Sequence, residues 1–433
     1  MRRATPALLL AALATAPLTA QESRPSLVEL SAIAKARAAR QRPAQEQALA
    51  PYLGDLSLAF KDNEAFLLGR IQEVAKLGDG IAPVLLENMV PKDDSDAARN
   101  LAANCARVLE QMDPADYVDA LLELAQARSE TARSWALHLL GQSRSSHAAL
   151  ALANQLDGLK GRDLVAAIDA LRQLGDRSAA PSVVQHVQVA DRRLREAALR
   201  YLAQSRNPAV RATMLRQLPM ETEPDMMLRY AAYLEGAVQA DAEAADVLLL
   251  LIATERLDQD QKVQVVRALS VVAPKGHAGT MRALKGVVDR GDTTALGRQA
   301  ALVLRDLGDR SGLQTLFTNL NKQVRERRRE SGPYIARAEA YMALAAWEDA
   351  TRDLRDAIEH SRQGSTLTYL YLQIAVCEAK RGRIPYVLKS LQDGRPSLAQ
   401  IQEEAARHPE FQKALESDAL RKYLEARSGE RGR

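Results

Sequence analysis

The sequence contains few aromatic residues: Phe, Trp and Tyr together make up 4% of its 433 residues. Because β-strands are enriched in aromatic and β-branched residues, this scarcity argues against a sheet protein. Alanine is abundant instead, and it favours helices that pack closely. Apolar residues make up 47% of the chain and charged residues 26%, which is enough to bury a large core. The composition therefore predicts an all-α protein with almost no strand.

Cysteine and histidine are also scarce. Cys105 and Cys377 are the two cysteines and lie far apart in the sequence, so we expect a small buried residue at each and no disulfide between them. The six histidines form no His-x-x-x-His pair, and no Cys-x-x-Cys occurs. His138 lies in an apolar stretch and is interpreted as a structural residue. Asp93, Asp94 and Asp96 lack the spacing of a calcium loop and are better explained by helix capping.

Phosphate-binding and nucleophile motifs are missing as well. The sequence has no Gly-x-x-x-x-Gly-Lys, no Gly-x-Gly-x-x-Gly after a strand and no Gly-x-Ser-x-Gly. Other carboxylate pairs, such as Glu403 and Glu404, lie where a solvated helix face explains them. We therefore predict no catalytic residue, no metal and no cofactor.

The first residues carry an export pattern. Residues 1–20 combine Arg2 and Arg3 with an apolar Ala/Leu run and a small residue, Ala20, before Gln21, which is typical of a secretory signal peptide. Its removal lowers the formal charge from +4 to +2, too balanced to favour a nucleic-acid partner. We expect an exported protein, periplasmic or extracellular, with no stable membrane insertion after cleavage and with lead-in helices over residues 21–59.

Residues 159–202 contain a unit that the rest of the chain repeats. Leu164, Ile168, Leu171 and Leu174 mark one face of a helix, and a second helix begins within a few residues of Gly175. Neither helix buries its apolar face alone, so the unit must stack on copies of itself. Corresponding positions recur at intervals of about 28 to 35 residues, at Leu77, Met112, Leu140, Leu174, Leu202, Ala237, Val272 and Leu307.

The turns after these positions resemble one another. Gly78, Gly141, Gly175 and Gly308 are expected to supply a left-handed cap, and a following Asp or Ser to cap the next helix. The turn after Ala237 has no such glycine, which predicts a distorted unit. The fold class predicted is an α-solenoid, a right-handed superhelix of stacked helical hairpins.

Part of the repeated unit resembles a known repeat family. Ala167 to Pro181 follow the form Ala-x-x-Ala-Leu-x-x-Leu-Gly-Asp-x-x-Ala-x-Pro, which resembles the short bacterial HEAT-like repeat, also known from phycobilin lyases. The resemblance spans about residues 60–318, and we assign residues 60–330 to this array. It implies a fold more than a function. Phycobilin lyases are cytoplasmic, so an exported chain argues against that activity.

A second repeat type begins after the charged residues 325–330 and Ser331-Gly332-Pro333. Residues 331–427 resemble tetratricopeptide repeats with a closing cap, with a disordered tail expected over residues 428–433. The resemblance rests on the small residues Ala338, Ala350 and Ala357 and on Tyr341, whereas Tyr334 and Arg337 replace the family's Trp and Leu. Apolar residues on both sides of residues 325–334 predict one continuous superhelix that changes curvature there.

Binding is the function that such arrays most often serve, on the concave surface lined by one helix of each hairpin. The candidate surface residues are Arg193, Arg195, Arg200, Arg211, Arg216, Arg229, Tyr369 and Tyr371. Ordinary solubility is the competing explanation for the arginines. Tyr341 and Trp347 are instead expected in the repeat core.

Two functional hypotheses follow. The first is a non-enzymatic exported scaffold that binds a protein or peptide. The second is an accessory or catalytic component of an extracytoplasmic process, in the cell envelope or in polysaccharide processing, with a site assembled between repeats or a lyase activity on the HEAT-like fold.

Overall fold

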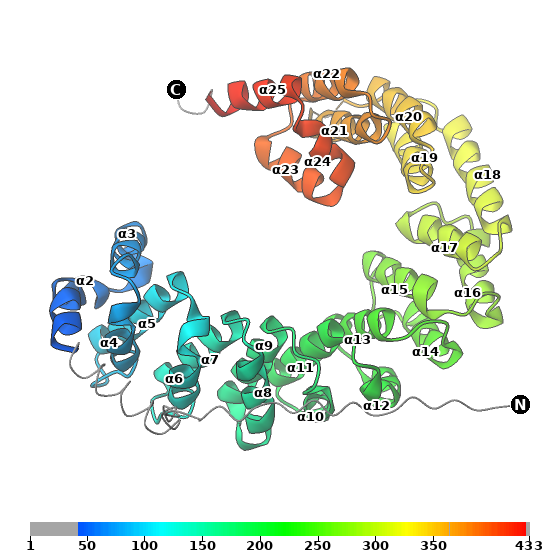
Figure 1. The fold of residues 1–433 in the computed structure, drawn as a ribbon. Helices are drawn as coiled ribbons and strands as arrows, with labels where there is room; N and C mark the ends of the chain where they lie inside the picture. The colour runs from blue at the N-terminus through cyan, green and yellow to red at the C-terminus, as the bar shows by residue number, and fades with distance from the viewer. Residues whose placement is uncertain (1–41, 363, 430–433) are drawn as a thin grey trace, which may run out of the picture. The chain divides into compact units, whose positions relative to one another are not determined.

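The computed structural model describes residues 42–362 and 364–429 (Figure 1). This part of the chain holds 24 complete α-helices and no strand, and within each of its compact units the helices pack against one another. The prediction of an all-α solenoid is therefore confirmed. The predicted signal peptide over residues 1–20 and the first part of the predicted lead-in segment lie outside the described residues.

The chain divides into two compact units, with the division after Ser143. The first unit contains the α-helices α2 (Leu53–Leu56), α3 (Glu64–Ala75), α4 (Ala82–Asn88), α5 (Asp96–Gln111), α6 (Val118–Leu124) and α7 (Glu130–Gln142). Its 3₁₀ turns are η1 (Ala50–Tyr52), η2 (Phe60–Asp62), η3 (Asp79–Ile81) and η4 (Pro114–Tyr117). In this unit α3, α5 and α7 pack side by side, with α4 against α5 and α6 against α7.

The second unit contains the remaining helices. They are α8 (Ser146–Gln155), α9 (Gly161–Gln173), α10 (Ala180–Val183), α11 (Arg192–Ser205), α12 (Arg211–Gln217), α13 (Pro224–Ala237), α14 (Ala242–Ala253), α15 (Gln259–Val272), α16 (Ala278–Asp289), α17 (Ala295–Asp306), α18 (Ser311–Glu326), α19 (Ser331–Ala343), α20 (Trp347–Glu359), α21 (Gly364–Lys380), α22 (Ile384–Gly394), α23 (Leu398–Arg407), α24 (Pro409–Leu415) and α25 (Asp418–Gly429). Its 3₁₀ turns are η5 (Leu156–Gly158), η6 (Val184–His186), η7 (Pro208–Val210) and η8 (Leu218–Met220).

Between α9 and α18 the helices form two rows. The odd-numbered helices α9, α11, α13, α15 and α17 contact one another in turn, and α12, α14, α16 and α18 form the other row (Figure 1). Each odd-numbered helix buries a stripe of apolar residues against its neighbours. In α9 these residues are Leu164, Ala167, Ile168, Ala170 and Leu171. The opposite face of the odd row stays open to solvent, and it carries the candidate site.

Glycine ends α9 as predicted. Gly175 has a φ of 71°, in the left-handed region that glycine adopts without strain. Asp176 follows it, and one carboxylate oxygen accepts a hydrogen bond from the backbone N–H of Ala179 at 3.0 Å. Gly308 repeats this arrangement with a φ of 106°, and Asp309 accepts from the N–H of Ser311 at 2.8 Å. The turn chemistry read from the sequence is thus confirmed at both places.

Other turns differ from the prediction. Gly141 does not cap α7 but lies buried inside it, and the left-handed residue is Arg144, with a φ of 53°. Arg206 ends α11 in the same conformation, and Ala240 takes it before α14. A non-glycine residue tolerates this backbone region at a cost that surrounding packing must offset. The turn that lacks glycine therefore forms, with Ala240 as its left-handed residue.

Side-chain caps begin many of the helices. Ser95 caps α5 by accepting from the N–H of Ala98, and Asp93 in turn accepts from the N–H of Ser95 at 2.9 Å. This hydrogen bonding lowers the pKa of Asp93 below its usual value. The cap is therefore Ser95 rather than one of the acidic residues, and Asp93 supports it by holding its backbone N–H. Among the described residues, no group of three or more His, Cys, Asp or Glu side chains is arranged to hold a metal ion.

Packing is continuous near residue 330, where the sequence predicts a change of repeat type. Helix α18 contacts α19, and the rings of Phe317 and Tyr341 lie 4.9 Å apart between their centroids. Arg337 of α19 also donates a hydrogen bond to Asn321 of α18 at 2.8 Å. Residues 325–334 therefore lie inside the second unit and join two helices that are packed together.

The core residues of the C-terminal helices match the expectation closely. Ala338, Ala350 and Ala357 are buried in one cluster, and Tyr341 and Trp347 pack against it. Cys105 and Cys377 are both free and buried, and burial raises the thiol pKa of each to about 12. The predicted disordered tail is helical at residues 428 and 429, which belong to α25, and its remaining residues lie outside the described part.

Candidate functional site

A surface pocket lies over the open face of the odd-numbered row. Its volume is about 560 Å³, and it spans four consecutive helices of that row, α9, α11, α13 and α15. The polar residues that line it are Arg172, Arg200, Gln204, Asp225, Arg229 and Gln264, with Ala203, Leu228 and Ala232 among them. We call this the arginine pocket.

The three arginines of the pocket share two carboxylates. Arg172 donates to Asp169 at 3.3 Å, and a terminal nitrogen of Arg200 lies 3.5 Å from the other oxygen of Asp169. Glu196 similarly serves two arginines. Its Oε1 accepts a 2.9 Å hydrogen bond from Arg229 and lies 3.9 Å from Arg200. The result is a row of alternating charges with arginine at both ends, and Asp225, which also lines the pocket, adds a third carboxylate.

Arg200 is the least firmly held of the three. Both of its ion pairs, at 3.5 and 3.9 Å, are longer than an ordinary charged hydrogen bond. Its side chain is 38% exposed, and that of Arg229 is 32% exposed. The Nε of each of these two residues is buried and has no hydrogen-bond acceptor among the described residues. The pair therefore keeps donor capacity that the described part of the chain does not fully use.

Arg172 is held by a different contact. The amide of Gln204, one repeat later, donates to the backbone carbonyl of Arg172 at 2.9 Å, and its Oε1 accepts from the Arg172 guanidinium at 3.3 Å. Gln204 thus links the end of α9 to the end of α11. The edge of the pocket is fixed by this reciprocal pair, whereas its centre, at Arg200, is held only by loose ion pairs.

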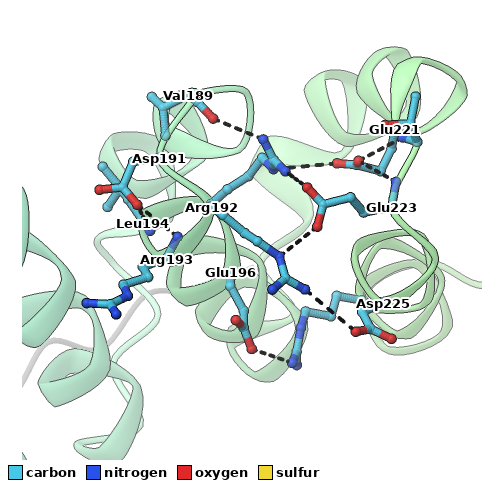
Figure 2. A network of polar contacts seen from close by, with 12 residues as sticks. Val189, Asp191, Arg192, Arg193, Leu194, Glu196, Glu221, Glu223 and Asp225 are labelled. Atoms are coloured by element: carbon cyan, nitrogen blue, oxygen red, sulfur yellow. Dashed lines mark hydrogen bonds and ion pairs between the residues drawn. The ribbon is translucent and has the colours of Figure 1, made fainter.

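Arg195 and Arg192 belong to a network at the start of α11, which meets the arginine pocket at Asp225, 3.9 Å from Arg192 (Figure 2). Arg192 donates to Glu223 at 2.7 Å, which raises the arginine's pKa, and Arg195 donates to the other oxygen of Glu223 and to the carbonyl of Val189. Glu221 lies 3.8 Å from Arg195. These contacts tie α11 to the loop before α13 and occupy the Arg195 guanidinium within the fold, outside the arginine pocket.

Arg193 lies on the same helix but outside that network. Figure 2 shows its side chain directed away from Glu221 and Glu223. The residue is exposed, and its backbone N–H is the group that donates to Asp191, the cap of α11. Arg193 precedes Glu196 and Arg200 by about one and two turns of α11, so it extends the positive face of that helix toward its N-terminus.

The other predicted residues lie elsewhere. Arg211 and Arg216 belong to α12, in the other row of helices, and Arg211 is bound to Asp241 at 2.5 Å and to Glu243 at 2.8 Å. Tyr369 and Tyr371 belong to α21. Tyr369 is 41% exposed and faces Glu339 at 3.5 Å, whereas Tyr371 packs against Gly394. The structure therefore brings only Arg200 and Arg229 of the predicted set into the pocket, with Arg193 on the same helix as Arg200.

Sequence reasoning missed the residues that complete the pocket. Arg172 and Arg200 occupy the same position of the repeated Ala-Leu-Arg at residues 170–172 and 198–200, so the repeat itself held a signal for Arg172. Asp169 and Glu196 looked like ordinary charged residues of solvated helices. Their role depends on which arginine of the next helix reaches them. That depends on how the two helices are aligned against each other, which cannot be read from the sequence.

No family model matches the chain, and no curated protein matches it. Among solved structures, the crystal structure of an engineered protein is similar, with 17% identity and a TM-score of 0.44 over 86% of this chain and 96% of that one. Within the described residues, no helix is both long enough and apolar enough to cross a membrane.

Proposed function

We propose that this protein is an exported, non-enzymatic scaffold that binds a protein or peptide on the open face of its odd-numbered helices. We further propose that residues 60–330 form repeats of the HEAT-like type and residues 331–427 repeats of the tetratricopeptide type. The observation that carries the binding proposal is the arginine pocket, in which residues from four successive helices meet at one depression.

Three features of the pocket support a binding role. It is built from parts of several repeats, as recognition surfaces of solenoid proteins are. Apart from the carboxylate of Asp225, its polar groups are amides and guanidiniums, which donate hydrogen bonds but are poor general acids or bases at neutral pH. Its arginines are partly exposed and share their carboxylates, so a ligand can reach them without breaking the apolar core.

The proposal is tested by selection from a random peptide library displayed on phage, with the purified full chain as the target. Peptides enriched on the wild-type chain should lose most of their binding when Arg200→Gln and Arg229→Gln are combined. The matched control is Arg216→Gln, which removes an exposed arginine from the other row and should leave binding unchanged. Failure to enrich any peptide, or equal binding to the double variant, would overturn the proposal.

A further inference from the structure

The ion pairs of the arginine pocket point to the chemistry of the ligand. Three guanidiniums share two carboxylates there, so each of these carboxylates is divided between two arginines, while the third carboxylate of the pocket, Asp225, lies 3.9 Å from Arg192. Arg200 and Arg229 both reach the same oxygen, Oε1 of Glu196, at 3.9 and 2.9 Å. Their terminal nitrogens therefore stand close enough for one further carboxylate to contact both.

We propose that the pocket binds an acidic segment of a partner protein, and that Glu196 occupies the place of the partner's carboxylate when no partner is bound. This proposal rests on the proposed binding function and specifies its ligand. An incoming aspartate or glutamate takes over the hydrogen bond from Arg229 and closes on the loosely held Arg200. Glu196 then turns toward solvent, since its side chain is already 31% exposed.

A peptide fits the pocket better than a nucleic acid does. The depression is about 560 Å³ in volume and is lined by Asp225 as well as by arginines, and the Asp225 carboxylate would repel a continuous phosphate backbone. Ala203, Leu228 and Ala232 provide apolar contact for the aliphatic parts of a peptide beside its acidic side chain. The chemistry therefore favours isolated carboxylates spaced by small or apolar residues.

If the Glu196 carboxylate holds the place of the ligand, removing its charge should strengthen the binding of an acidic peptide. Glu196→Gln keeps the shape of the side chain and an oxygen acceptor for Arg229 but removes the charge that competes with the ligand. We expect a synthetic peptide with glutamates separated by serine and glycine to bind this variant about two- to fivefold more tightly than wild type. Arg200→Gln combined with Arg229→Gln should weaken the same peptide about tenfold.

Glu243→Gln is the matched control. Glu243 also pairs with an arginine, Arg211 at 2.8 Å, and its replacement changes the net charge by the same amount. It lies in α14, in the other row of helices. Fluorescence anisotropy of the labelled peptide, with full-length chains at low and at physiological salt, measures all the variants on one scale.

The outcomes separate the possibilities. Tighter binding by Glu196→Gln alone supports the proposal. Equal tightening by Glu243→Gln indicates general charge attraction and overturns it, as does equal binding of the peptide with glutamine in place of glutamate. A single-stranded oligonucleotide that binds more tightly than the peptide would assign the pocket to polyanions instead. If library peptides bind but are not acidic, this inference fails while the proposed function stands.

Discussion

Two stretches of the second unit hold their arginines in opposite ways. In α19 and α20, Arg337 and Asp353 form a two-pronged pair with both hydrogen bonds at 2.7 Å, and the aspartate is only 3% exposed. In α11, Arg200 has two ion pairs of 3.5 and 3.9 Å to partly exposed carboxylates. An arginine whose donors are saturated inside the fold serves packing, whereas one with loosely shared partners remains free to change them.

The contacts between successive helices also differ between these two stretches. From α9 to α13, buried tyrosines reach back one repeat, as when Tyr201 donates to Asp176 at 3.0 Å and Tyr233 to the carbonyl of Asn207 at 2.7 Å. From α19 to α22, small residues allow close approach instead, and Tyr371 lies directly over Gly394. The helices from α9 to α13 are therefore joined by hydrogen bonds at their turns, and their charged face stays open. In the helices from α19 to α22, charged groups such as Arg337 and Asp353 pair with each other inside the fold.

The largest effect is expected for Asp353→Ala. The substitution leaves Arg337 buried without its partner, which costs about 3–5 kcal/mol in proteins. Asp169→Ala should cost no more than about 1 kcal/mol, because the arginines that it contacts are partly exposed and keep other acceptors. Urea denaturation of both variants measures the difference. Similar losses for the two would remove the distinction between the two kinds of arginine.

Close approach in the second stretch is tested by Gly394→Ala. A Cβ at position 394 would lie 2.4 Å from the Cβ of Tyr371, so the helices must separate. We expect a loss of about 1–3 kcal/mol. Gly286→Ala in α16 is the control, because the nearest atom to its new Cβ is the end of Arg290 at 3.9 Å, and alanine is the better helix former. A neutral Gly394→Ala, measured by thermal unfolding, would show that α21 and α22 do not depend on this contact.

The Arg211–Asp241 pair predicts a pH dependence. The hydrogen bond from Arg211 lowers the pKa of Asp241, so the ionised carboxylate stabilises the fold above the usual aspartate pKa, and this stabilisation is lost as the pH falls through the lowered value. Asp241→Asn retains a capping oxygen for α14. It should cost about 1–2 kcal/mol at pH 7 and progressively less below about pH 4. A pH-independent cost in denaturation experiments would contradict the assignment.

The smallest effect is expected for the turn tyrosines. Tyr201→Phe removes the hydrogen bond that the tyrosine hydroxyl donates to Asp176. Burial, together with that carboxylate, raises the pKa of the hydroxyl, so the donor is neutral. We expect a loss of about 1 kcal/mol. Tyr230→Phe is the matched control, because its hydroxyl makes no hydrogen bond to another described residue, and it should be close to neutral. Equal effects would mean that ring packing alone links the repeats.

Much of the fold was predictable because its determinants are local. Gly175 with Asp176, Gly308 with Asp309 and the small residues Ala338, Ala350 and Ala357 act within their own turn or hairpin. The left-handed residues Arg144 and Arg206 were not predictable, because neither residue type prefers that conformation and the surrounding packing imposes it.

The candidate site was predictable only in part. Arg200 and Arg229 stood out as arginines of amphipathic helices, but so did Arg195 and Arg211, whose carboxylate partners lie about 30 residues away. Which arginine is saturated and which is loosely held depends on how successive helices are rotated against each other. That rotation follows from the packing of entire helices and leaves no short signature in the sequence.

The most direct test of the account is an exchange of charge in the arginine pocket. Arg200→Glu and Arg229→Glu, combined with Glu196→Lys, invert the three central charges, and Asp169→Asn removes the carboxylate that would otherwise face the new glutamate at position 200. Fluorescence anisotropy would compare a glutamate-containing peptide with its lysine counterpart on wild-type and inverted chains, after circular dichroism has shown that both are helical. The account predicts that wild type prefers the glutamate peptide and the inverted chain the lysine peptide. An unchanged preference would contradict the claim that these arginines recognise the partner.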